Sequence, residues 1–336
     1  MKDKEFLKGM LFTAAGGIGW GISGVCGQYL FMEYNTDTSW LTSIRMLFSG
    51  LLLLAMAVPL GEKKIFAIFK DRKNLVRLIL FAIAGLLLCQ YTFLAAIKYS
   101  NSGTATVLQS LNVVIMAVVV SFTSHTKMSR WQIIAIALAI SGTYLIVTNG
   151  NPGRLVISPT GLTFGIFSAI GVVSYTLLSQ KLIKEWSNTL ITGWGMLIGG
   201  MAMSTLTRAW IVPDNLDQKA LLVIAVIVVI GTAGGFSLFL EGVKYIGPVK
   251  GTLIACLEPA TATALSALCL GTHFGVGEII GFCAIMATVF ISTKANSEKA
   301  KKNAGDATDT DKPKENQQAD KINENQQSSE GNKEEM

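Results

Sequence analysis

Long apolar runs separated by short polar connections occupy most of this chain. About 20 residues of helix, at 1.5 Å per residue, cross a hydrocarbon core of about 30 Å. Ten runs approach that length. Their predicted limits are 9–31, 38–60, 75–97, 103–122, 131–149, 159–180, 188–209, 219–241, 250–270 and 276–294. The pattern predicts a polytopic membrane protein with ten spans.

The runs favour helices over the strands of a barrel. Barrel strands alternate apolar and polar residues over about ten positions, whereas these runs are longer and uniformly apolar. We therefore predict an all-α fold. The N-terminal run lacks a small-residue cleavage site, so we interpret it as a retained first helix rather than a signal peptide.

Charge is scarce and unevenly placed. Only 15% of the 336 residues are charged, against about 25% in soluble domains, which excludes an ordinary soluble enzyme. The segment 295–336 holds 17 of the charges and almost no large apolar residue, so we predict a disordered cytoplasmic tail. No basic stripe with interleaved aromatic residues is present, so nucleic-acid binding is not expected.

Lysine and arginine are distributed asymmetrically between the two sets of connections. With the N-terminus in the cytoplasm, sixteen basic residues of the body lie in cytoplasmic segments. Four lie outside: Lys98, Arg154, Arg208 and Lys219. Because cytoplasmic loops carry an excess of Lys and Arg, both termini are predicted to be cytoplasmic.

The chain contains an internal repeat. An offset of 146 residues pairs Lys98-Tyr99 with Lys244-Tyr245, and similar offsets pair Gly9 with Gly161 and Gly50 with Gly200. Five spans is an odd number, so the second copy enters the membrane from the opposite side, as in secondary transporters. The predicted units are a first repeat at 1–150, an inverted second repeat at 151–294 and the tail at 295–336.

These features resemble the ten-helix EamA branch of the drug/metabolite transporter superfamily over about residues 8–294. The residues that carry the resemblance are Trp20-Gly21, Arg45 within SIRMLFSG, AAIKYSNSGTATVL from Ala95, and VKYIGPVKGTLIACLEPA from Val243. The resemblance implies two five-helix repeats that transport small metabolites, amino-acid export being the leading expectation. It also implies that Glu258-Pro259 is a common feature of the fold.

Two departures from the family pattern stand out. The proline of the fourth span, matched by Pro259 in the ninth, is Val113 here, which predicts a fourth span straighter than the ninth. The glutamates that commonly end spans four and nine are Thr126 and Thr272. We therefore assign Thr126 and Thr272 none of the roles that the family's glutamates could have.

Two charged residues inside the predicted spans are candidates for function. A charge near the bilayer midplane costs at least about 2.5 kcal/mol and faces a cavity or a partner. Glu258 is interpreted as a proton site, a ligand for a substrate ammonium or a structural hydrogen-bond acceptor at a proline kink. Arg45 pairs either with a substrate carboxylate or with carbonyls at a helix end.

Neutral polar and aromatic residues at similar depth complete a candidate cavity wall. Amides can bind either end of a zwitterion, and aromatic faces bind apolar groups or ammonium. The alternative for each aromatic is core packing or lipid contact. The candidate substrate-binding residues are Trp20, Ser23, Arg45, Gln90, Tyr91, Gln109, Asn112, Tyr175, Trp194, Phe236 and Glu258.

Signatures of other chemistry are missing from the sequence. The five cysteines lie singly in apolar runs, and neither a phosphate-binding loop, a Ser-His-Asp set nor a metal-ligand cluster occurs. We therefore predict a protein that is not an enzyme and has no cofactor or metal. Its driving force would be an ion or proton gradient, substrate exchange or the gradient of the substrate itself.

The leading hypothesis is a secondary transporter that exports amino acids or related compounds by alternating access. The alternatives are a transporter of organic cations or drugs and, from another class, a non-transporting membrane scaffold whose tail recruits a partner. The expected partners are a small-molecule substrate and the lipid bilayer, with protons, a counter-substrate and a second copy of the chain as further candidates. The expected location is the plasma membrane, specifically a bacterial inner membrane.

Overall fold

A computed structural model describes residues 2–58, 65–123, 128–153, 155–247, 251 and 254–292. These residues lie within one compact unit, Met1–Thr293. Within the described residues, eight helical stretches are long and apolar enough to cross a membrane, and two shorter apolar helices, Leu257–Leu270 and Val276–Ser292, match the last two predicted runs. The predicted all-α fold is confirmed; the tail 295–336 and Thr126 lie outside the described residues.

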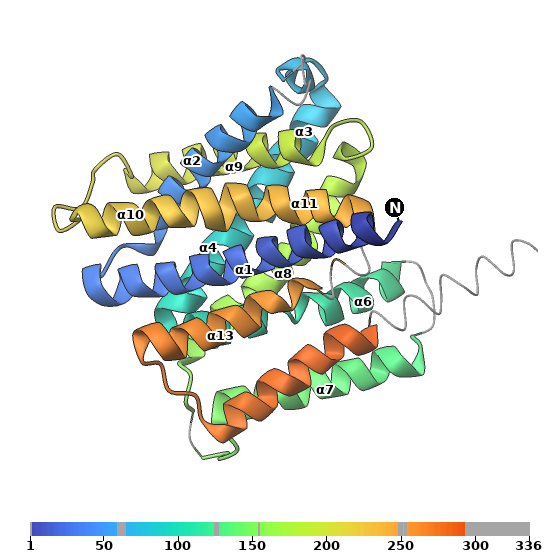
Figure 1. The fold of residues 1–336 in the computed structure, drawn as a ribbon, viewed down its shortest axis with the longest axis vertical. Helices are drawn as coiled ribbons and strands as arrows, with labels where there is room; N and C mark the ends of the chain where they lie inside the picture. Colours follow the sequence, from blue (N-terminus) through green and yellow to red (C-terminus); the bar gives the residue numbers. More distant parts are fainter. Residues whose placement is uncertain are drawn as a thin grey trace, which may run out of the picture. The chain divides into compact units, whose positions relative to one another are not determined.

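Helices follow one another with short connections (Figure 1). Those before residue 150 are α1 (Lys2–Tyr34), α2 (Thr38–Ala57), η1 (Ala67–Lys70), α3 (Arg72–Leu80), η2 (Phe81–Leu87), α4 (Leu88–Tyr99), α5 (Ser102–Gln109), α6 (Asn112–Thr123) and α7 (Arg130–Thr148). Those after it are α8 (Pro159–Leu182), α9 (Asn188–Thr207), α10 (Gln218–Val226), η3 (Ile227–Gly234), α11 (Gly235–Ile246) and α13 (Leu257–Leu270), followed by Val276–Ser292.

Side-chain caps begin several of these helices. Asp37, Asn101, Ser158 and Asp217 each accept a hydrogen bond from a backbone N–H at the start of the helix that follows. Such caps satisfy donors that have no partner within the helix and stabilise it by about 1 kcal/mol. At Asp37 and Asn101 they allow the next helix to begin only a few residues after the preceding one ends.

Two π-helical segments interrupt the third and eighth predicted spans. η2 (Phe81–Leu87) and η3 (Ile227–Gly234) begin 146 residues apart, so they occupy equivalent positions under the offset found in the sequence. Each contains a glycine on which another helix packs closely. A Cβ on Gly85 would lie 2.8 Å from the Cα of Tyr175, and one on Gly231 would collide with Ser23.

The crossing of α2 and α9 has the reciprocal pattern of a two-fold axis. A Cβ on Gly50 would lie 2.7 Å from the backbone nitrogen of Leu197, and one on Gly200 would lie 2.8 Å from that of Leu47. Gly50 and Gly200 are equivalent in the repeat, as are Leu47 and Leu197. These recurring contacts support a two-fold relation; inversion of the halves across a membrane stays a prediction.

The fourth predicted span is interrupted although it has Val113 where the ninth has Pro259, and the ninth has a turn at the equivalent position, Cys256. α5 ends at Gln109 and α6 begins at Asn112, with a turn between them. The Ser110 hydroxyl donates to the carbonyl of Thr106 (3.0 Å), and the Asn112 amide donates to that of Gln109 (2.7 Å). Polar side chains thus satisfy carbonyls at this break without a proline.

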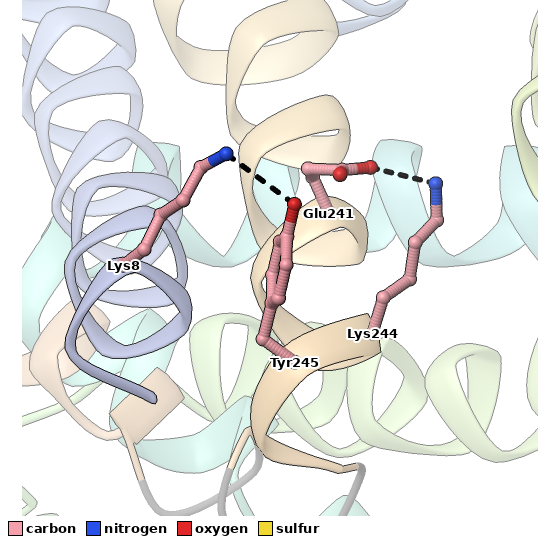
Figure 2. A network of polar contacts seen from close by, with 4 residues as sticks. All are labelled: Lys8, Glu241, Lys244 and Tyr245. Carbon is pink, nitrogen blue, oxygen red and sulfur yellow. Dashed lines mark hydrogen bonds and ion pairs between the residues drawn. The ribbon is translucent and has the colours of Figure 1, made fainter. Parts of the chain in front are cut away.

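α1 packs against α11 along one side and against α13 along another (Figure 1). Near its N-terminal end, Lys8 Nζ donates to the hydroxyl of Tyr245 (3.3 Å), while Glu241 and Lys244 form an ion pair at 2.6 Å (Figure 2). Exposed pairs of this kind contribute little to stability. The cluster therefore marks a polar end of the α1–α11 contact rather than a functional centre.

Candidate functional site

The interior contains two adjoining cavities, of about 80 and 190 Å³. The smaller is lined by Trp20, Arg45, Leu86, Cys89, Gln90, Phe93, Gln109, Val172, Tyr175, Phe236 and Glu258. The larger shares five of these residues and adds others that include Ser110, Asn112, Phe239 and Pro259. Helices from both predicted repeats contribute, so the site lies where the halves meet.

Cavity-lining residues occur in pairs that the repeat offsets relate. The pairs are Trp20 with Val172, Gln90 with Phe236, Phe93 with Phe239, Gln109 with Ala255, and Asn112 with Glu258. The equivalent positions of the two halves therefore face a shared space. The chemistry within each pair differs, which makes the polar lining asymmetric.

Arg45, on α2, is buried, with 4% of its surface exposed. Its Nε donates to the hydroxyl oxygen of Thr232 (2.9 Å), which in turn donates to the carbonyl of Ile227 (2.9 Å) in η3. This chain of bonds fixes the guanidinium through one nitrogen. Nη1 is also buried, and no described residue accepts a hydrogen bond from it.

Trp20, on α1, is held by rings of α11. Its ring centroid lies 5.2 Å from that of Phe236, edge to face, and 5.0 Å from that of Phe239. A Cβ on Gly235 would lie 2.7 Å from the indole nitrogen, so glycine is needed where the indole crosses that helix. Among the described residues this buried N–H has no acceptor.

Glu258 lies in the first turn of α13 and lines both cavities. A helix N-terminus stabilises a nearby carboxylate through the helix dipole. In the described part of the chain no group donates to this carboxylate, and Arg45, which lines the same cavity, is not within ion-pair distance of it. The structure therefore presents two opposite charges that do not neutralise each other directly.

The amide side chains differ in what they bind. Gln109 donates to the hydroxyl of Ser168 (2.6 Å) and Asn112 to a backbone carbonyl, so both are oriented by the protein. Gln90 is buried on α4 and lines the smaller cavity, and no described residue hydrogen-bonds its side chain. It is available to a ligand.

Eight of the eleven predicted residues line these cavities, and Ser23, Tyr91 and Trp194 do not. Ser23 packs on Gly231, and the ring of Tyr91 packs edge to face against Phe164. Trp194 donates to the carbonyl of Ile65 (3.0 Å), and its ring packs at a tilt against Phe66 and edge to face against Phe69. Tertiary packing thus occupies these three side chains.

Sequence reasoning missed several lining residues, among them Leu86, Cys89, Phe93, Val172 and Phe239. None is polar enough to stand out in an apolar span. The repeat contains the missing signal, because Val172 is the equivalent of Trp20 and Phe93 that of Phe239.

Comparison with known proteins agrees with this architecture. The chain is 35% identical over 294 residues to the "Uncharacterized inner membrane transporter YicL" of Salmonella typhimurium, covering 88% of this chain and 98% of that protein. It is 23% identical over 299 residues to an "Uncharacterized transporter" of Clostridium kluyveri, covering 87% and 94%.

A solved structure titled "Crystal structure of protein" has a TM-score of 0.56 at 13% identity, over 88% of this chain and 96% of that one, which supports the fold alone. The profile of the EamA-like transporter family matches residues 7–148 and 159–294. Together with the apolar helices, these matches show that the chain is a multi-pass membrane transporter and belongs to the EamA-like transporter family.

Proposed function

We propose that this protein is a secondary transporter that exports amino acids or related small metabolites. The observation that carries the proposal is the internal cavity with a buried arginine and an unpaired glutamate. Charged groups inside a membrane mark substrate or ion pathways. No phosphate-binding loop occurs in the sequence, so transport is driven by a gradient or by exchange rather than directly by ATP.

The proposed mechanism is alternating access between repeats 1–150 and 151–294. Gln28, on α1, accepts from the backbone N–H of Ser102 (2.8 Å) and the hydroxyl of Ser266 (2.9 Å), and donates to the hydroxyl of Thr272 (3.0 Å). These four residues, here called the Gln28 cluster, join α1, α5 and the end of α13. They hold the helices together at the end of the site nearer Tyr34.

The repeat gives Gln28 an equivalent, Gln180, at the end of α8. Gln28 is 6% exposed, whereas Gln180 is exposed and makes no hydrogen bond with the described residues. Inverted repeats interconvert access states by exchanging the conformations of their halves. We assign Gln180 the bonded role in the opposite state, so that one glutamine closes each end in turn.

Counterflow tests the transport proposal. Purified full-length protein in liposomes preloaded with unlabelled amino acids should accumulate the labelled form of its substrate from outside. Liposomes without protein and proteoliposomes without internal substrate serve as controls. Absence of counterflow for every amino acid in a complete panel would contradict amino-acid transport.

The second candidate is transport of an organic cation or drug, favoured by Glu258 and the aromatic rings of Trp20 and Phe236. Glu258→Gln removes the negative charge while preserving shape. It should abolish transport of a permanently charged ammonium compound in the cation case. Retained flux of such a compound would eliminate the cation hypothesis.

The scaffold hypothesis assigns the function to the tail instead. Deleting 295–336 leaves the family-matched helices essentially intact. Undiminished counterflow by the shortened protein supports transport, whereas a scaffold loses its partner. The transport proposal also places the protein in a bacterial inner membrane with both termini cytoplasmic, following the distribution of lysine and arginine.

A further inference from the structure

Two residues that line the smaller cavity each carry a buried N–H group with no acceptor among the described residues. Arg45 Nη1 and Trp20 Nε1 are both inaccessible at the level of the atom, and both residues line this space. A buried donor without a partner costs roughly 1–3 kcal/mol, and more when it is charged. Both side chains are held in place, Arg45 by Thr232 and Trp20 by two phenylalanines. Both residues belong to the wall of one cavity, so their N–H groups are fixed donors for a hydrogen-bond acceptor that reaches them from that space.

We propose that Arg45 and Trp20 bind the carboxylate of a zwitterionic substrate and that Glu258 binds its ammonium group. This rests on the proposed transport function and assigns each charged end of the substrate to named atoms. Thr232 is a positioning residue, because it occupies Nε and leaves the outer nitrogens of the guanidinium for a carboxylate. Arg binds carboxylates through such paired donors.

The charge balance favours a zwitterion over the alternatives. An organic cation would compensate Glu258 but leave the charge of Arg45 buried without a counter-ion. A dianion such as phosphate would compensate Arg45 but face the carboxylate of Glu258. Burying one unpaired charge is strongly unfavourable, whereas a zwitterion supplies both counter-charges at once.

The adjoining cavity supplies room for a substrate side chain. It has a volume of about 190 Å³ and is lined by apolar groups that include Val113, Val172, Phe239 and Pro259. Gln109 and Asn112 are oriented by other protein groups, so they add few free polar contacts there. The inferred substrate class is therefore an amino acid with an apolar side chain and with both its carboxylate and its ammonium free.

A series of three analogues separates the two subsites. Wild-type proteoliposomes are tested for counterflow of leucine, of leucinamide, which lacks the carboxylate, and of N-acetylleucine, which lacks the ammonium. We expect flux of leucine to exceed that of either analogue at least tenfold. The variants then identify the residue responsible for each preference.

Trp20→Phe retains a ring but removes the N–H, and Arg45→Lys retains the charge but removes the paired donors. Each should reduce leucine flux several-fold and shrink the preference for leucine over leucinamide, leaving rejection of N-acetylleucine intact. Glu258→Gln should shrink the preference over N-acetylleucine instead. Trp186→Phe is the matched control, because its indole N–H is also buried without a described acceptor but lies outside both cavities.

The outcomes separate a failure of the proposed subsites from a failure of the proposed transport function. If the wild-type protein transports leucine and leucinamide equally, the carboxylate subsite is overturned, but the proposed transport function is retained. No flux for any amino acid overturns the proposed function itself. Equal losses in Trp20→Phe and Trp186→Phe assign Trp20 to packing. Thermal unfolding of each variant shows whether it is folded, and the ratio of analogue fluxes is independent of the amount of active protein.

Discussion

Replacing Gln28 by leucine should loosen one end of the molecule. The Gln28 side chain makes three hydrogen bonds outside α1, to Ser102, Ser266 and Thr272, and one within α1, to the sulfur of Met32. Leucine is of similar size but can make none of them. The variant therefore tests whether the Gln28 cluster holds the closed end together or merely fills it.

The size of the effect follows from the number of bonds. Each net hydrogen bond contributes about 0.5–1.5 kcal/mol, so the three bonds to other segments account for roughly 1.5–4.5 kcal/mol in favour of the closed end. The released groups bind water when the end opens, so no further penalty accrues in the open state. At about 1.4 kcal/mol for each factor of ten, the opening equilibrium should rise by a factor of roughly 10 to 1,600.

Amide hydrogen exchange measures this opening directly. Peptides that contain Ser102 and the start of α5 should exchange faster in Gln28→Leu by about the factor given above, since opening limits exchange of a bonded amide. Peptides from the α2–α9 crossing should not change. Gln180→Leu is the matched control, because Gln180 is exposed in this state. A change below about threefold at Ser102 would refute the closing role.

Three further substitutions test the packing, the break in the fourth span and a helix cap. Gly50→Ala should lower stability by about 1–3 kcal/mol, because the added Cβ would lie 2.7 Å from the backbone of α9. Gly153→Ala is the control: the atom nearest to its Cβ is 3.6 Å away, so its stability should not change. Thermal unfolding measures both effects. Val113→Pro, in the first turn of α6, removes the bond from the Val113 N–H to the carbonyl of Ser110 (3.3 Å) and should cost about 1 kcal/mol. Val118→Pro, in the interior of that helix, should cost about 3 kcal/mol or more. The pKa of Asp217 is lowered chiefly by the α10 backbone N–H that it caps and then by a tyrosine hydroxyl. Its charged form therefore stabilises the fold above about pH 4 and this contribution is lost as pH falls through the lowered pKa; Asp217→Asn should reduce the acid sensitivity of unfolding, and an unchanged pH profile would contradict this.

The spans were predictable from the sequence because the bilayer imposes one simple requirement, an apolar run of sufficient length. Their internal interruptions were not. Hydropathy is the same for an α-helix and for the π-helical segments Phe81–Leu87 and Ile227–Gly234. The break after Gln109 depends on hydrogen bonds from Ser110 and Asn112, which no window average detects.

Charged and amide residues of the site stood out because polar groups are rare in apolar spans. That signal located Arg45, Gln90 and Glu258 but did not show which side chains the packing would occupy. Trp194 illustrates the difference, since its indole is bonded to a connection between helices rather than facing the cavity. The apolar wall, including Val172, becomes predictable only when the repeat is applied residue by residue.

Under the proposed mechanism, the repeat explains how two similar halves can bind a substrate whose two ends differ. Paired contacts such as Gly50 with Leu197 and Gly200 with Leu47 are alike in the two halves, so exchanging their conformations changes packing energy little. The charges are not paired in this way. The equivalent of Arg45 is Gly195, where a Cβ would lie 2.6 Å from a ring carbon of Phe81 and no side chain fits.

The equivalent of Glu258 is Asn112, which is neutral and oriented by a backbone carbonyl. Under the proposed mechanism, a zwitterion therefore has one bound orientation, set by Arg45 and Glu258, whichever end of the site is open. A ligand shifts the equilibrium between two access states only by its difference in affinity for them. Charges placed where the halves meet can therefore select the substrate without determining which end of the site is open. It follows that the gradient, rather than the site, determines the direction of net transport.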